Sequence, residues 1–207
     1  MKTWFVFLLY SWTALASAKA GSIFGTVHSN ENGLRDFVVY IENSFTNRFP
    51  APYAPILLEV RTNKANGAMF SPHVLPVIVG TTMELRNNDV VYHNVFSMSD
   101  IATFDFGPAK HGDPLSCWKF EKPGRVDVFC SIHANENCIV LVMANPYYTG
   151  TDYRNSYLLQ NIPAGTYRLK AWHERAPAQV KDVTVPKLGK VHVDFALGET
   201  APPIATR

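Results

Sequence analysis

Two imidazoles and one thiolate stand in the chain at a spacing that suits a metal ion. Cys130 and His133 lie three residues apart, and His93 lies well upstream, directly after Tyr92. A cysteine and a histidine this close together converge from one tight loop between two strands, and the distant histidine reaches in from another loop. Two imidazoles, a thiolate and a weak fourth donor suit copper that passes between Cu(I) and Cu(II) with little rearrangement. The spacing therefore predicts one copper ion per chain, bound by His93, Cys130 and His133.

Short motifs along nearly all of the chain after its N-terminus resemble a bacterial periplasmic family. The motifs are Phe70-Ser-Pro72, Val79-Gly-Thr81, His93-Asn-Val-Phe-Ser97, Phe104-Asp-Phe-Gly107, Lys122-Pro-Gly124 and Trp172-His-Glu174. The segments around His93 and Cys130 are also similar to the copper loops of plastocyanin-like cupredoxins. The family is often labelled methylamine utilisation protein or plastocyanin-like. The resemblance implies a cupredoxin-like Greek-key β-sandwich and a copper site.

The fourth donor departs from the pattern of that family, whose copper loop reads Cys-x-x-His-x-x-Met. Here the methionine position is Glu136, and Cys138 stands where plastocyanin has its methionine, eight residues after the cysteine. A carboxylate is a harder donor than a thioether, so Glu136 on copper favours Cu(II) and lowers the reduction potential. The sequence leaves three readings open, namely Glu136 as the ligand, Cys138 as the ligand, or neither.

The two cysteines outside the copper loop also allow two readings. In an oxidising compartment Cys117 and Cys138 form a disulfide if their Cα atoms lie within about 7 Å. Alternatively Cys138, which opens the apolar run Ile139 to Met143, is a buried free thiol. Among the other histidines, His173 lies beside Trp172 without a spacing partner, which indicates a structural residue rather than a ligand.

Strand patterns dominate the chain after the N-terminus. β-branched and aromatic runs separated by Gly, Pro, Asn and Asp occur at residues 37–41, 74–79, 139–143 and 191–197. Residues 82–86 alternate apolar and polar side chains, as in a strand with one wet face. No long helical stripe competes with these patterns. The sequence predicts an all-β fold, a cupredoxin-like Greek-key β-sandwich plus a small transthyretin-like or Ig-like β-sandwich.

The predicted second sandwich is divided along the chain. Residues 21–45 resemble the opening hairpin of a transthyretin-like or carboxypeptidase-regulatory-like module, and residues 147–198 resemble its remainder. Residues 46–146 would then be the copper domain, inserted between the two parts, and 199–207 a flexible tail. The alternative is that the first hairpin belongs to the copper domain and the second sandwich begins near Pro146.

The N-terminus predicts export. Lys2, a mostly apolar stretch from Trp4 to Ala16 and small residues up to Ala20 match a secretory signal peptide at residues 1–20. No later segment is long enough to span a bilayer, so no transmembrane span is expected after cleavage, and the expected location is the periplasm. The formal net charge of +2, with both signs interspersed, argues against nucleic acid as a partner.

These observations favour a binding and electron-transfer protein over an enzyme. Cys130 and His133 lack the orienting third group and the oxyanion hole of a thiol hydrolase. The leading expectation is one-electron transfer between the copper ion and a periplasmic redox partner protein. The alternatives are copper handling or sensing, a red-type copper site with Glu136 as axial ligand, or a structural zinc site, since Cys, two His and Glu also make a closed tetrahedron.

Overall fold

The described part of the chain is built of β-strands. The structure, a computed structural model, describes residues 20–31, 33–42, 45, 49–50, 52–63, 67–113 and 116–198, and these residues form strands β1 to β17 and no helix. The all-β fold predicted from the strand patterns is confirmed. Residues 1–19 of the predicted signal peptide and the predicted tail lie outside the described residues. Among the described residues, no helix is long and apolar enough to cross a membrane.

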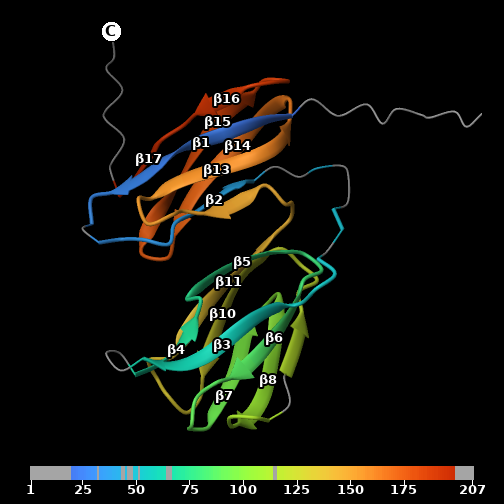
Figure 1. Cartoon of the computed structure of the whole chain (residues 1–207), viewed down its shortest axis with the longest axis vertical. Helices are drawn as coiled ribbons and strands as arrows, with labels where there is room; N and C mark the ends of the chain where they lie inside the picture. Colours follow the sequence, from blue (N-terminus) through green and yellow to red (C-terminus); the bar gives the residue numbers. More distant parts are fainter. Residues whose placement is uncertain are drawn as a thin grey trace, which may run out of the picture.

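Nine consecutive strands form one sandwich, here called the central sandwich (Figure 1). They are β3 (Ile56–Asn63), β4 (Gly67–Ser71), β5 (Val74–Ile78), β6 (Thr82–Asn87), β7 (His93–Ser99), β8 (Ala102–Ala109), β9 (Ser116–Lys119), β10 (Gly124–Cys130) and β11 (Asn137–Met143). One sheet has the order β4-β3-β6-β9 and the other β5-β11-β10-β7-β8. Buried side chains from both sheets, among them Leu58, Met83 and Val128, form one core between them.

The strand patterns of the sequence explain how these sheets face their core. In β6 the buried residues are Met83 and Leu85, and Thr82 and Glu84, which alternate with them, are only partly buried, as the predicted alternation requires. In β11 every residue from Cys138 to Met143 is buried. That strand is covered on both faces, because its second face meets the other half of the molecule.

The remaining strands form a second sandwich, here called the terminal sandwich. They are β1 (Ala20–Ser29), β2 (Val38–Ile41), β12 (Tyr148–Gly150), β13 (Ser156–Pro163), β14 (Gly165–His173), β15 (Ala176–Val185), β16 (Lys190–His192) and β17 (Phe195–Leu197). β1 pairs with β13, β16 and β17, and β2 pairs with β12 and β14. Blue strands from the start of the chain thus lie among orange and red strands from its end (Figure 1). This is the pairing of an interrupted sandwich, while the bounds of separately folding domains stay a prediction.

The predicted strand at residues 191–197 is divided into β16 and β17. Between them Val193 donates its backbone N–H to the carbonyl of Phe24, and Asp194 accepts hydrogen bonds from the backbone N–H and the hydroxyl of Thr26. These hydrogen bonds lower the pKa of Asp194. Val193 comes so close to β1 that a Cβ at Gly25 would overlap its carbonyl group. The alternation of apolar and polar residues at 191–197 does not predict this interruption of the strand.

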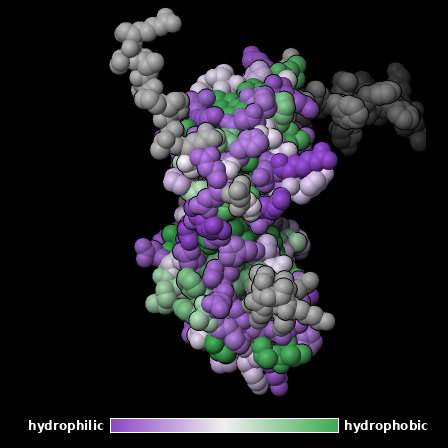
Figure 2. Space-filling view, turned by 90° about the vertical axis from the view of Figure 1, so that its left-hand side faces the viewer, coloured by the Kyte–Doolittle hydropathy of each residue, from purple (hydrophilic) through white to green (hydrophobic). Residues whose placement is uncertain are grey.

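An apolar contact joins the two sandwiches. Ile139, Leu141 and Met143 of β11 pack with Val38 of β2, and Tyr40, Val74, Tyr148 and Trp172 surround this cluster. Beside it, the carboxylate of Glu174 lies 3.0 Å from Nε2 of His73. Figure 2 shows two bodies joined at a narrower waist, whose surface is largely hydrophilic in this view. On this face the contact is therefore bordered by hydrophilic residues, although its centre is apolar.

Candidate metal centre

His93 is the first residue of β7 and lies inside the central sandwich. β7 pairs with β10 in a register that places Cys130 opposite Val95, so His93 and Cys130 lie at the same end of the sheet. Only 2% of His93 is exposed. The loop before it is held by the side chain of Asn87, whose amide donates to the carbonyl groups of Val91 and Ala109.

The connection from β10 to β11 brings three more side chains to this point. Cys130 ends β10, and its backbone N–H donates to the carbonyl of Glu136 (3.1 Å), which closes the loop. The N–H of Glu136 in turn donates to the carbonyl of His133 (3.1 Å). The loop is thereby folded tightly enough for the side chains of Cys130, His133 and Glu136 to converge. The sequence spacing predicts this convergence for Cys130 and His133.

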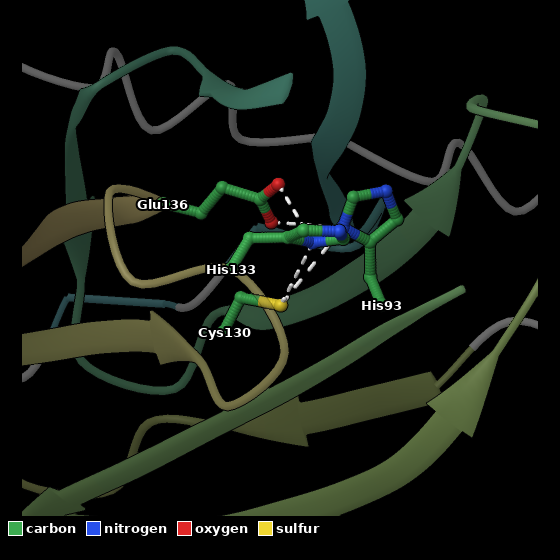
Figure 3. Close-up of side chains that lie close together, drawn as sticks. All are labelled: His93, Cys130, His133 and Glu136. Atoms are coloured by element: carbon green, nitrogen blue, oxygen red, sulfur yellow. Dashed lines mark hydrogen bonds and ion pairs between the residues drawn. The ribbon is translucent and has the colours of Figure 1, made fainter. Parts of the chain in front are cut away.

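Four side chains meet with their donor atoms within 4.8 Å of one another, namely His93, Cys130, His133 and Glu136 (Figure 3). Nδ1 of His93 lies 3.2 Å from Nδ1 of His133 and 2.8 Å from Oε2 of Glu136. The sulfur of Cys130 lies 3.9 Å from Nδ1 of His93 and 3.7 Å from Nδ1 of His133. His93, Cys130 and Glu136 are buried, and the side chain of His133 is 36% exposed.

These separations fit a metal ion at the centre of the group. With ligand bonds of about 2.0 to 2.3 Å, the donor atoms of a tetrahedron lie roughly 3.3 to 3.7 Å apart, close to the distances between these side chains. Oε1 of Glu136 is buried and has no hydrogen bond, although it lies 3.0 Å from Nδ1 of His133. That contact has the length but not the direction of a hydrogen bond, so this oxygen has no proton to accept. A cation would satisfy this buried carboxylate, whose Oε1 lies near His133 and whose Oε2 lies near His93.

The donor set suits copper and zinc better than calcium or magnesium, which prefer oxygen donors. Between these two metals, nitrogen and sulfur sites generally bind copper more tightly. When bound here, the metal would contact His93, Cys130, His133 and Glu136. That these four residues are its ligands stays a prediction.

Cys138 does not join the group. It is 1% exposed in the core of the central sandwich, where burial, and to a smaller extent the charge of Asp127, raise the pKa of its thiol. Cys117 is exposed on β9, and both thiols are free. Of the two readings for this pair, the structure has the free thiols and not the disulfide. Of the two axial positions, it brings in Glu136 and not Cys138.

The other histidines lie elsewhere. His173 is buried against the ring of Phe37, and its Nδ1 accepts the backbone N–H of Arg175, so it has a structural role. His73 contacts Glu174 in the waist. The sequence analysis missed Asp89, a buried carboxylate whose Oδ2 lies 3.3 Å from Nε2 of His93. The available signal was its position four residues before a candidate ligand.

Comparison with known proteins gives structural neighbours only. No family model matches the chain, and no curated protein matches it. Solved structures that resemble it include cupredoxins. Their TM-scores are low, so the assignment of a metal rests on the four side chains alone.

Three solved structures illustrate the likeness. A purple cupredoxin from Nitrosopumilus maritimus is 27% identical, covers 42% of this chain and 99% of its own, and has a TM-score of 0.39. A copper-containing nitrite reductase from Thermus scotoductus SA-01 is 27% identical over 44% of this chain, with a TM-score of 0.39, and the match spans only 23% of the reductase. A variant of oxidised amicyanin is 19% identical over 51% of this chain and 98% of its own, with a TM-score of 0.37.

Proposed function

We propose that the protein is an exported, cupredoxin-like carrier of one copper ion that transfers single electrons. The observation that carries this proposal is the convergence of two imidazole nitrogens, a thiolate sulfur and a carboxylate oxygen within 4.8 Å. Copper supplies the one-electron couple when it is bound. The protein residues supply a rigid donor set that needs little rearrangement between the two oxidation states.

Each side chain has a separate part in this function. His93, Cys130 and Glu136 are buried and would shield the metal from water. His133 reaches the surface with 36% of its side chain and offers the shortest route for an electron. Exposed apolar residues adjoin the candidate ligands in the chain, namely Val90, Val91, Tyr92 and Ile132. Such a surface suits a redox partner protein, which in an exported protein of this kind would be periplasmic.

The orientation of Glu136 favours one variant of this function. Its carboxylate points to both imidazoles, so it would bind as a fourth strong donor, as in a red-type copper centre. A hard anionic ligand stabilises Cu(II) and lowers the reduction potential. A protein with a low potential would give up its electron readily, or would hold Cu(II) as a copper-handling or sensing protein.

The test is a titration of the purified metal-free protein with Cu(II), followed by visible absorption, EPR and metal analysis. The expected result is one copper per chain with an intense thiolate-to-copper band. Cys130→Ser should remove the band. Cys117→Ser, which removes an exposed thiol on β9, should leave it unchanged. A colourless protein purified with tightly bound zinc, or one that binds no metal, would contradict the proposal.

A further inference from the structure

Asp89 stands behind the candidate copper site on the side of His93 that faces away from the other donors. Its Oδ2 lies 3.3 Å from Nε2 of His93, and the two side chains are 3% and 1% exposed. Nδ1 of the same ring faces Cys130, His133 and Glu136. The imidazole of His93 therefore lies between a buried carboxylate and the metal position.

The loop around Asp89 holds this carboxylate in place. Oδ1 of Asp89 accepts the backbone N–H of Val90 (2.7 Å), which leaves Oδ2 directed at His93. The backbone N–H of Asp89 donates to Oδ1 of Asn87 (2.7 Å). Asn87 is itself tied to the end of β8 through the carbonyl of Ala109 (2.9 Å). The contact is thus part of a network that connects β6, the loop and β8.

The contact has two consequences for the imidazole. A carboxylate that accepts a hydrogen bond from Nε2 fixes the proton on that nitrogen and leaves the lone pair of Nδ1 free for a metal. It also makes Nδ1 a stronger donor, because the carboxylate stabilises positive charge on the ring. With the thiolate of Cys130 and the carboxylate of Glu136, Asp89 is a third buried acidic group around the site, and negative charge of this kind favours Cu(II) over Cu(I).

We propose that Asp89 is a positioning residue that selects the metal-binding tautomer of His93 and lowers the reduction potential of the copper site. This inference rests on the proposed copper function and assigns Asp89 a part beyond shaping the loop. Loss of an outer carboxylate of this kind typically weakens metal binding about 10-fold to 100-fold. We expect Cu(II) binding to be weakened more than Cu(I) binding.

The test compares Asp89→Asn with Asp105→Asn. Asp105 is an exposed carboxylate on β8 that accepts the backbone N–H of Gly107, so its variant loses the same charge from the same sandwich. In Asp89→Asn we expect Cu(II) affinity, measured by competition with a chelator, to fall at least tenfold. Each tenfold fall in the ratio of Cu(II) affinity to Cu(I) affinity raises the reduction potential by about 59 mV. Asp105→Asn should change neither quantity.

The outcomes separate the inference from the proposed function. If Asp89→Asn has the same Cu(II) affinity and the same reduction potential as Asp105→Asn, the proposed role of Asp89 is refuted while the copper function stands. If the wild-type protein binds no copper, the proposed function fails. The tautomer is still measurable by ¹⁵N NMR of the wild-type protein, even if Asp89→Asn does not fold. A proton on Nε2 of His93 is expected, and a proton on Nδ1 alone would overturn the inference.

Discussion

At the scale of single residues, Glu136 would determine what kind of copper site the proposed function uses. A thioether in its place would bind copper weakly, whereas a carboxylate binds as a strong anionic donor. Glu136 is 2% exposed, and its two oxygens lie 2.8 and 3.0 Å from the imidazoles of His93 and His133. Oε1 of this buried carboxylate has no hydrogen bond, and a metal ion bound among the four side chains would satisfy it.

Replacing this carboxylate by a thioether should change the absorption spectrum and the reduction potential of the site. In Glu136→Met we expect a stronger thiolate-to-copper band and a potential higher by at least about 60 mV, a tenfold shift in relative affinity. Spectroelectrochemical titration measures both. Glu121→Met, at an exposed position before β10, is the matched control and should behave as wild type. An unchanged spectrum and potential in Glu136→Met would mean that Glu136 does not bind copper.

The sequence predicted that His93, Cys130 and His133 converge, because the last two belong to one short loop whose spacing is visible in the chain. It offered Glu136 as one of three readings for the fourth donor. The choice between Glu136 and Cys138 was not predictable, since it depends on where β11 begins and which face of that strand meets the core. Asp89 was missed for a related reason. Its role depends on the turn that directs its carboxylate to His93, and the sequence does not show that this aspartate is buried.

At the scale of elements, the backbone of Val193 packs closely against Gly25 of β1, and the sequence gives no sign of this contact other than the glycine itself. β16 and β17 run parallel to β1 on either side of the point where Val193 crosses Gly25. The alternating residues 191–197 predicted one continuous strand. Its interruption follows from the hydrogen bonds that Val193 and Asp194 make to β1, which involve residues far apart in the chain.

A methyl group at Gly25 should destabilise the protein. In Gly25→Ala the new Cβ would meet the backbone of Val193, which cannot rotate away as a side chain can, and we expect a loss of about 1 to 3 kcal/mol in the free energy of unfolding. Chemical denaturation measures this loss. Gly150→Ala in β12 meets open space and should change stability by no more than about 1 kcal/mol. Equal stability of the two variants would show that β1 and Val193 are not in close contact.

At the scale of the whole molecule, the two sandwiches are connected through β11. Its residues alternate between two cores, with Val140 and Val142 in the central sandwich and Leu141 and Met143 in the contact with the terminal sandwich. The sequence showed an uninterrupted apolar run here, which is typical of a strand buried on both faces. It could not show what covers the second face, because β2 and β14 come from distant parts of the chain.

Truncating a side chain in this contact should destabilise the protein as a whole. We expect Leu141→Ala to lower the free energy of unfolding by about 2 to 5 kcal/mol and to increase hydrogen exchange in β2 and β14 of the other sandwich. Leu188→Ala, the same substitution at a residue that is 65% exposed, should have little effect. If exchange in Leu141→Ala increased only within the central sandwich, the contact would contribute nothing to the stability of the terminal sandwich.

The interrupted pairing of the terminal sandwich also sets an order of folding during synthesis. β1 and β2 leave the ribosome first, but their antiparallel partners β12, β13 and β14 follow only after the whole central sandwich has been made. Until then the backbone groups of β1 and β2 lack these partners, and open strand edges are where nascent chains associate wrongly. The strands of the central sandwich form one continuous stretch of chain, so that sandwich can close first. β1 and β2 of the terminal sandwich are therefore the strands that stay longest without their antiparallel partners.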